Sequence, residues 1–429
     1  MVAQIMSTYL PRIVDDELDE LRADLPAIAM EGPKGVGKTA TARRRARTTI
    51  LLDQPTERAL LEADPERLAR EPAPVLLDEW QRYPQAWDLV RRAVDDGAEP
   101  GRFLLTGSAA PLHANVHSGA GRIVRMRVRP LSIAERGLAV PTVSLRVLLD
   151  GHRPPLSGTH GVGLPTLVDS LLASGLPAVT ASRPRARRAL LDGYLEQIVE
   201  REFAELGHTV RRPATLRAWL TAYAAATATT TSYNRILDAA TPGEGDKPAK
   251  TTTIAYREVL EHLYLLEPLP AWAPASSALA RLAQAPKHYL ADPALAARLL
   301  GADRTALLAG DETRAPTLRH GDVTGRLFES LVTLSARVYA QRAEARVYHL
   351  RTHRGDHEVD LLVERDDGRI LALEVKLSPN VRDFDVTHLT WLQRQLGSDL
   401  LDAVVVTTGK HAYRRPDGIG VVPAVLLGP

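Results

Sequence analysis

The segment from Gly32 to Thr39 reads Gly-Pro-Lys-Gly-Val-Gly-Lys-Thr and fits the phosphate-loop template G-x-x-x-x-G-K-S/T at every fixed position. An apolar stretch, residues 27–31, precedes it and a helix-compatible stretch, residues 40–47, follows it, which is the context this motif requires. Backbone N–H groups of such a turn bind phosphate oxygens. Lys38 is a predicted catalytic residue that would neutralise the charge of the β- and γ-phosphates, and the Thr39 hydroxyl would ligate Mg²⁺. The predicted nucleotide-binding residues here are Gly32, Pro33, Lys34, Gly35, Val36, Gly37, Lys38, Thr39 and Ala40.

Two carboxylates end a second apolar run, Val75-Leu-Leu-Asp78-Glu79. A continuous apolar run is typical of a buried parallel strand. Asp78 is the candidate for holding the Mg²⁺ water shell, and Glu79 the candidate general base for the attacking water. Acids at the end of a strand are common by themselves, so the interpretation depends on the phosphate loop upstream.

A third apolar run, Phe103 to Ser108, ends in hydroxyl side chains. Thr106 and Ser108 are candidates for sensing the γ-phosphate, and a plain Ser/Thr turn is the alternative. Further strands are predicted at residues 49–53 and 123–129, with helices at residues 57–70 and 86–93 between the motifs. Strands alternating with helices predict an α/β fold with a parallel sheet, which binds ligands beyond the carboxyl ends of its strands.

A second constellation lies far from the phosphate loop. Residues 357–363 and 370–376 predict a hairpin around the turn Asp367-Gly368, with Asp360 on one strand and Glu374 and Lys376 on one face of the other. An upstream helix carries Glu329, and a helix at residues 386–396 and a strand at 403–407 follow. Asp360, Glu374 and Glu329 are candidate metal ligands with Glu358 as a supporting acid, while Lys376 would position the attacking water. An exposed hairpin with a surface ion pair is the alternative.

Composition sets wider limits. The chain has 429 residues, 45% hydrophobic and 25% charged, which predicts a globular protein of two to four domains. A net charge of +2 supports no general affinity for nucleic acid, and the absence of cysteine excludes disulfides and cysteine-ligated metals. Without a membrane-spanning run or signal peptide, a cytoplasmic location away from membranes is expected. Lysine stands at only seven positions, which singles out Lys38 and Lys376 as places where a compact ammonium is needed.

Taken in order, these segments resemble a widespread prokaryotic family of AAA-type P-loop ATPases whose C-terminal domain of unknown function ends in a PD-(D/E)xK nuclease-like fold. The resemblance covers nearly the whole chain. Its carriers are Tyr9–Arg12, Gly32–Thr39, Leu77–Gln81, Leu105–Ser108, Gly121-Arg122, Pro130–Glu135, Ser174–Pro177, Tyr194-Leu195, Lys287–Asp292, Gly325–Glu329, Glu358–Asp360 and Glu374–Lys376. Ser174-Gly-Leu-Pro177 departs from the more usual Gly-Gly-aromatic-Pro of the linker region.

The resemblance implies ATP and Mg²⁺ as cofactors and Arg122 as a candidate contact to the γ-phosphate, with a structural arginine as the alternative. It also implies a homo-oligomer assembled through the ATP site, and DNA or a protein as a partner. The expected domains are a P-loop ATPase domain (1–140), a helical lid or linker (141–210), a winged helix (211–275) and a nuclease-like domain (276–429). The recognition helix, residues 254–263, carries Glu258 and Glu261, so a winged helix used only for packing is a second interpretation.

Three functional hypotheses follow. In the first, ATP turnover controls a DNA-directed or nuclease activity. In the second, the ATPase is a switch whose inactive nuclease-fold domain only binds DNA or a protein. In the third, the chain is a nucleotide-binding scaffold with negligible turnover, against which the pair Asp78 and Glu79 argues.

Overall fold

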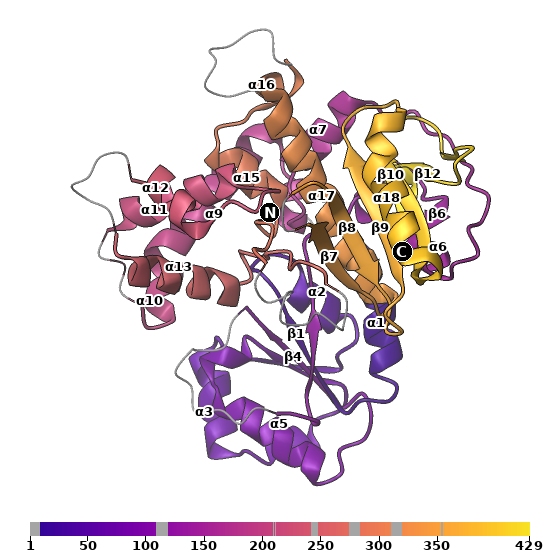
Figure 1. The fold of residues 1–429 in the computed structure, drawn as a ribbon. Coiled ribbons are helices and arrows are strands. Elements are labelled where there is room, and N and C mark those ends of the chain that lie inside the picture. Colours follow the sequence, from indigo (N-terminus) through magenta and orange to yellow (C-terminus); the bar gives the residue numbers. More distant parts are fainter. Residues whose placement is uncertain are drawn as a thin grey trace. The chain divides into compact units, whose positions relative to one another are not determined.

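The computed structural model describes residues 9–108, 119–208, 210, 212–241, 248–273, 284–309, 320–352 and 355–429, and for residues 320 and 321 the backbone alone. The chain divides into two compact units. The N-terminal unit comprises Met1–Arg129 with the later segments Arg201–Thr209 and His262–Tyr264, and the C-terminal unit comprises the rest (Figure 1). This division by contacts is coarser than the four predicted domains, whose boundaries stay predictions; those near residues 211 and 276 lie outside the described residues.

A five-stranded parallel sheet forms the centre of the N-terminal unit, with its strands in the order β2-β3-β4-β1-β5. The strands are β1 (Ala27–Glu31), β2 (Thr48–Leu51), β3 (Val75–Asp78), β4 (Phe103–Gly107) and β5 (Val124–Arg127). The helices are α1 (Ile13–Leu21), α2 (Lys38–Arg43), α3 (Pro55–Ala63), α4 (Arg67–Arg70), α5 (Gln85–Asp95) and α10 (Phe203–Glu205). A 3₁₀ turn, η1 (Trp80–Arg82), follows β3.

Strands β3 and β4 are buried along their whole length, as their continuous apolar sequences predict. Ala27, Leu77 and Leu105 from three neighbouring strands share one core with Trp87 and Val90 of α5. Parallel pairing brings the carboxyl ends of β1, β3 and β4 to one edge, so the three motifs meet there. The single helix predicted over residues 57–70 is instead two helices, α3 and α4, because Pro65 between them cannot donate a backbone hydrogen bond.

The C-terminal unit contains a six-stranded mixed sheet in the order β11-β12-β10-β9-β8-β7. Its strands are β7 (Arg346–Arg351), β8 (Glu358–Glu364), β9 (Ile370–Lys376), β10 (Leu400–Thr407), β11 (Tyr413–Arg414) and β12 (Gly420–Pro423). The hairpin of β8 and β9 is antiparallel, whereas β9 pairs with β10 in parallel. Helix α17 (His320–Arg342) packs against β7 and β9, and α18 (Thr387–Leu396) packs against β8 and β10.

This unit also contains further helices. They are α6 (Leu145–Leu149), α7 (Leu164–Leu172), α8 (Pro177–Thr180), α9 (Pro184–Gln197), α11 (Pro213–Ala225), α12 (Tyr233–Ala239), α13 (Lys250–His262), α15 (Pro293–Leu299) and α16 (Arg304–Leu308). A π-helical turn, Ile198–Glu202, ends α9, and a short sheet pairs β6 (Val143–Ser144) with β13 (Leu427–Gly428). After α13, Leu266 and Leu269 take part only in isolated bridges, so a winged helix stays a prediction.

The structure confirms the predicted fold class: an α/β chain with a parallel P-loop sheet and a further C-terminal sheet domain. Whether that C-terminal sheet is a nuclease fold stays a prediction. Within the described ranges, no helix combines the length and the apolar character needed to cross a membrane.

Candidate functional site

The phosphate loop lies between β1 and α2 at the carboxyl edge of the sheet. Gly35 and Gly37 have φ angles of 80° and 99°, which glycine adopts at little cost. At Gly32 a Cβ atom would lie 2.1 Å from the carbonyl oxygen of Val128, so only glycine fits between the loop and the chain after β5. The spacing of the glycines therefore has a steric reason at each of these positions.

Lys38 is 7% exposed, and its Nζ donates hydrogen bonds of 2.7 and 2.9 Å to the carbonyl oxygens of Gly32 and Pro33. Burial lowers the pKa of Lys38 to about 8, although the carboxylate of Glu79 opposes this shift. The ammonium thus lies within its own loop, where backbone carbonyls replace the phosphate oxygens that it is predicted to bind.

Thr39, Asp78 and Thr106 form one hydrogen-bonded group. Both threonine hydroxyls donate to Oδ1 of Asp78, Thr39 over 2.7 Å and Thr106 over 2.5 Å. Asp78 is buried, and its nearest cation is Arg43, at 3.7 Å from Oδ2. A hydroxyl and a carboxylate held together at the end of the phosphate loop are oxygen donors of the kind that Mg²⁺ prefers. The residues present therefore fit the predicted metal.

Glu79 follows β3 with a left-handed backbone, φ 55° and ψ 43°. A non-glycine residue in this region costs of order 1–3 kcal/mol, and such residues cluster at functional sites. Gln81 donates a short hydrogen bond to Glu79 through Nε2, and the same nitrogen lies 3.5 Å from Oγ of Ser108. Oε1 of Gln81 is buried and has no hydrogen-bond partner within the described chain. Gln81 thus connects the predicted base to the predicted sensor serine, a link that the sequence did not indicate.

Arg12 lies outside the phosphate loop and is hydrogen-bonded to it. Its guanidinium is buried and donates to the carbonyl oxygens of Val36 and Arg129, over 2.8 and 2.7 Å. The hydroxyl of Tyr9 lies 2.8 Å from that of Thr41 in α2 and donates to Asp15. Both residues were noted only as part of the N-terminal Tyr-Leu-Pro-Arg segment, and no local pattern predicted these contacts.

Lys34 contacts two acids from the segment Arg201–Thr209. Its Nζ makes a short ion pair with Glu202 and lies 3.9 Å from Glu205. Arg82 also pairs with Glu205, at 3.1 Å. A sequence separation of 168 residues hides this contact from local analysis.

Arg122, the predicted γ-phosphate contact, pairs with Asp95 at the end of α5, at 2.8 Å between Nε and Oδ1. This geometry favours the alternative role, a structural arginine.

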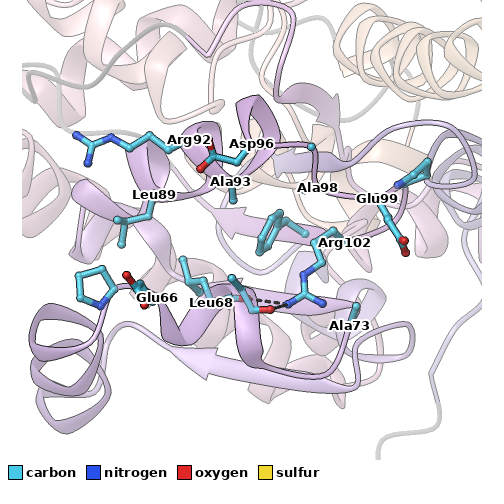
Figure 2. A pocket seen from close by; sticks show the side chains of 15 residues that line it. Glu66, Leu68, Ala73, Leu89, Arg92, Ala93, Asp96, Ala98, Glu99 and Arg102 are labelled. Carbon is cyan, nitrogen blue, oxygen red and sulfur yellow. Dashed lines mark hydrogen bonds between the residues drawn. The ribbon is translucent and has the colours of Figure 1, made fainter.

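A cavity of about 560 Å³ in the N-terminal unit lies near the amino ends of β3 and β4 (Figure 2), whereas the phosphate loop follows the carboxyl end of β1. Leu68, Leu89 and Phe103 contribute its apolar wall. Arg102 donates hydrogen bonds of 2.8 Å to three carbonyl oxygens of the α4 region, so its charge is already compensated. The cavity brings no catalytic group together, in contrast to the loop edge.

The C-terminal unit brings its predicted acids together around a lysine that sequence reasoning missed. Lys287 is 1% exposed, and its Nζ lies 2.9 Å from Asp360, 2.9 Å from Glu358 and 3.0 Å from Glu329. Tyr289 donates a further hydrogen bond of 2.6 Å to Glu329. The ammonium thus contacts two of the three predicted metal ligands, Glu329 and Asp360, and the supporting acid Glu358.

Glu374 and Lys376 lie on β9 beside this set. Lys376 donates to Oε1 of Glu374 over 2.7 Å, whereas Oε2 is buried without a partner among the described residues. The Val375 amide donates to Asp360 over 2.9 Å. The period-two placement of Glu374 and Lys376 on one face is consistent with this contact.

The acids of this cluster differ in the direction in which their surroundings shift the pKa. Burial raises the pKa of Glu329 to about 7 and that of Glu374 to about 8, in both cases with help from the charge of Asp360. Burial is the strongest single influence on Asp360 and acts to raise its pKa. The charge of Lys287, the hydrogen bonds from Val375 and Lys287 and the charge of Lys376 together outweigh burial and hold this pKa below the ordinary value. The same acids raise the pKa of Lys287 well above its ordinary value despite burial.

This arrangement does not fit the predicted metal. A permanently charged ammonium at hydrogen-bond distance from three carboxylates leaves them no free set of ligands. In the described part of the chain, no group of three or more His, Cys, Asp or Glu residues could hold a metal ion.

Comparisons with known proteins match three successive segments of the chain. Residues 24–136 match the model of an AAA domain, residues 164–306 a domain of unknown function (DUF8612), and residues 324–427 another domain of unknown function (DUF4143). The N-terminal unit is a P-loop domain of AAA type. Its motif residues, from Gly32 to Ser108, all lie within the matched range.

The chain is also similar to whole proteins. Uncharacterized proteins of Mycobacterium tuberculosis and Mycobacterium bovis are each 28% identical over 411 residues, which is 93% of this chain and 80% of theirs. Among solved structures, a Walker-type ATPase of Pyrococcus abyssi matches with a TM-score of 0.40 and 17% identity, over 66% of this chain and 94% of that one.

Proposed function

We propose that the N-terminal unit binds ATP with Mg²⁺ and hydrolyses it. The observation that carries the proposal is the hydrogen bond of Thr39 to Asp78, next to the buried Lys38 of a phosphate loop. The loop amides and Lys38 bind the β- and γ-phosphates. Thr39 and Asp78 hold the metal, which supplies positive charge against the phosphate oxygens.

Glu79 is the proposed general base. It follows directly on the proposed metal ligand Asp78, and the hydrogen bond from Gln81 fixes the orientation of its carboxylate. It takes a proton from the attacking water, while Thr106 and Ser108 line the end of β4 where that water is oriented. Loss of a general base lowers a rate by about 10²- to 10⁴-fold.

Turnover of ATP by the full chain tests this proposal. We expect Lys38→Ala to lose nucleotide binding and Glu79→Gln to bind ATP but hydrolyse it about 10²- to 10⁴-fold more slowly. Lys410→Ala, at an exposed lysine of the C-terminal unit, serves as the matched control. Normal affinity and turnover in Lys38→Ala would remove the phosphate-loop role, and normal turnover in Glu79→Gln would move the base elsewhere.

For the C-terminal unit, the geometry favours a switch over a nuclease. We propose that ATP turnover controls what this unit binds, DNA or a protein partner, and that its acids do not catalyse metal-dependent cleavage. The position of Lys287 among Glu329, Glu358 and Asp360 supports this choice, because it satisfies the acids internally. Assembly through the ATP site and a cytoplasmic location belong to the same proposal.

Cleavage assays separate the two roles. Single-stranded DNA, double-stranded DNA and RNA are incubated with Mg²⁺ or Mn²⁺, with and without ATP, beside Lys376→Ala and Lys38→Ala. We expect no cleavage that depends on Lys376. Metal-dependent cleavage that disappears in Lys376→Ala while ATP turnover persists would instead establish the nuclease.

A further inference from the structure

We propose that a polar cavity in the C-terminal unit binds a phosphoryl group carried by a nucleotide or by a nucleic-acid strand. The cavity has a volume of about 670 Å³, within the usual range for ligand pockets. The segment Thr229–Ser232 before α12 and the end of β7 form its walls. The inference rests on the proposed binding role of the C-terminal unit and gives that role a ligand class.

The lining of the cavity selects for an oxyanion. Among the described residues of the lining, five side chains are hydroxyls, two are guanidiniums, Arg235 and Arg351, and none is an acid. Arginine matches the geometry of phosphate oxygens, and serine and threonine hydroxyls donate to them. Among the described lining residues there is no Phe, Tyr or Trp, so base stacking on these side chains is not the basis of recognition.

Arg351 is available for such a ligand. It donates over 2.5 Å to Thr230, and its nearest carboxylate among the described residues, on Glu358, lies 4.0 Å away. Glu358 is itself bound to Lys287 at 2.9 Å. Arg351 and the much closer Lys287 thus share one carboxylate, so Glu358 compensates the charge of Arg351 only in part. Arg235, in α12, is exposed and also lines the cavity.

Two further atoms of the lining indicate what carries the phosphoryl group. His349 is 1% exposed, and its Nε2 lies 3.2 Å from the Ala285 carbonyl oxygen, which fixes Nδ1 as an acceptor. Nδ1 of His349 and Oε1 of Gln284 are both buried without a partner in the described chain. A pair of unsatisfied acceptors favours a ligand that also carries O–H or N–H donors, as a nucleoside does.

The proposal is tested by measuring how tightly the full-length protein, in a buffer that contains EDTA, binds two probes. Fluorescence anisotropy follows a labelled single-stranded oligo(dT), and calorimetry follows AMP. Arg235→Ala and Arg351→Ala are compared with Arg346→Ala, which removes an exposed arginine at the other end of the same strand, β7. Arg351→Lys keeps the charge but loses the planar fork, and melting curves establish that each variant folds.

We expect each cavity arginine to contribute about tenfold or more to affinity, and Arg346→Ala to bind like wild type. For the strand, each loss also lowers the slope of log affinity against log salt by about 0.7. Binding of one probe alone upholds the proposal and identifies the source of the phosphoryl group. Equal affinity in wild type and both alanine variants overturns it, as does the absence of binding of either probe at millimolar concentration and about 50 mM salt.

Lys38→Ala separates this proposal from the proposed ATPase. A functional cavity keeps its affinity for AMP and oligo(dT) in that variant, whereas ATP binding by the phosphate loop is lost. The cavity variants should show the reverse pattern. Failure of one proposal therefore leaves the other intact.

Discussion

Replacing Lys287 by methionine removes a buried cation from the middle of the acidic cluster while keeping an unbranched side chain. Lys287 is 1% exposed and lies within 3.0 Å of three carboxylates. Two of them, on Glu329 and Asp360, are themselves largely buried, whereas Glu358 is 37% exposed and screened by solvent. The variant therefore leaves two buried acids without their counter-charge.

The expected loss in the free energy of unfolding follows from these two uncompensated carboxylates. Breaking a buried ion pair by removing one partner destabilises a protein by about 3–5 kcal/mol, because the remaining charge is uncompensated. Part of this cost is relieved when the acids take up protons. Removal of Lys287 raises the pKa of Asp360, whose low value depends on that ammonium. The destabilisation should thus be largest above pH 8 and should shrink as the pH falls.

Amide hydrogen exchange of β8 and β9 is the suitable measurement, because it reports the local opening free energy of one unit in a chain of two. The Val375 amide, which donates to Asp360, is a direct probe of the cluster. Lys410→Met, at an exposed position, is the control. In the Lys287→Met background, Asp360→Asn should recover part of the lost protection, since it removes one of the two uncompensated charges.

The reasoning is refuted if Lys287→Met loses less than about 1 kcal/mol of protection at pH 8. It is also refuted if Asp360→Asn deepens the loss instead of relieving it. Either result would show that Lys287 is not the counter-cation of this cluster.

Three other predictions concern metal, pH and loop support. Millimolar Mg²⁺ or Mn²⁺ should leave β8–β9 exchange unchanged in wild type but slow it in Lys287→Met; slowing in wild type would mean that a metal displaces the ammonium. ATP affinity should be constant below about pH 8 and should then fall about tenfold for each pH unit. The reason is that the free enzyme binds phosphate with protonated Lys38, whose pKa is about 8. An affinity measured by calorimetry that stays constant up to about pH 10 would contradict this prediction. Arg12→Ala should raise KM for ATP at least about tenfold with a smaller change in kcat, because two charged hydrogen bonds to the loop region are lost. An unchanged KM would mean that Arg12 contributes only to the stability of the fold.

What could be predicted from sequence was local. The phosphate loop is a continuous segment whose glycines have fixed backbone tasks, and β3 and β4 are apolar runs that end in polar residues. Because parallel strands align their carboxyl ends, these motifs could be placed at one edge without any coordinates. The hairpin of β8 and β9 was likewise predictable, since Asp367-Gly368 marks its turn.

What could not be predicted depends on contacts between distant segments. Arg12 reaches a carbonyl oxygen 117 residues away, and Lys287 reaches Asp360 across 73 residues. Neither lies in a helical or strand period that would place its side chain. The predicted metal at Asp360 and Glu374 came from the order of an acid, a strand turn and Glu-x-Lys, whereas the contact of Asp360 with Lys287 is visible only in the folded chain.

Composition nevertheless contained a signal for Lys287. The chain uses arginine for most of its positive charge, so each of the seven lysines is a candidate for a position where arginine would not serve. Lys250 and Lys410 are exposed, and Lys247 lies outside the described residues. The other four, Lys34, Lys38, Lys287 and Lys376, all contact a carboxylate or a loop carbonyl in one of the two clusters. A compact ammonium fits among closely spaced oxygens where a planar guanidinium needs more room. Lysine scarcity therefore marks Lys287 as belonging with the two lysines predicted to act, and the structure supplies its partners.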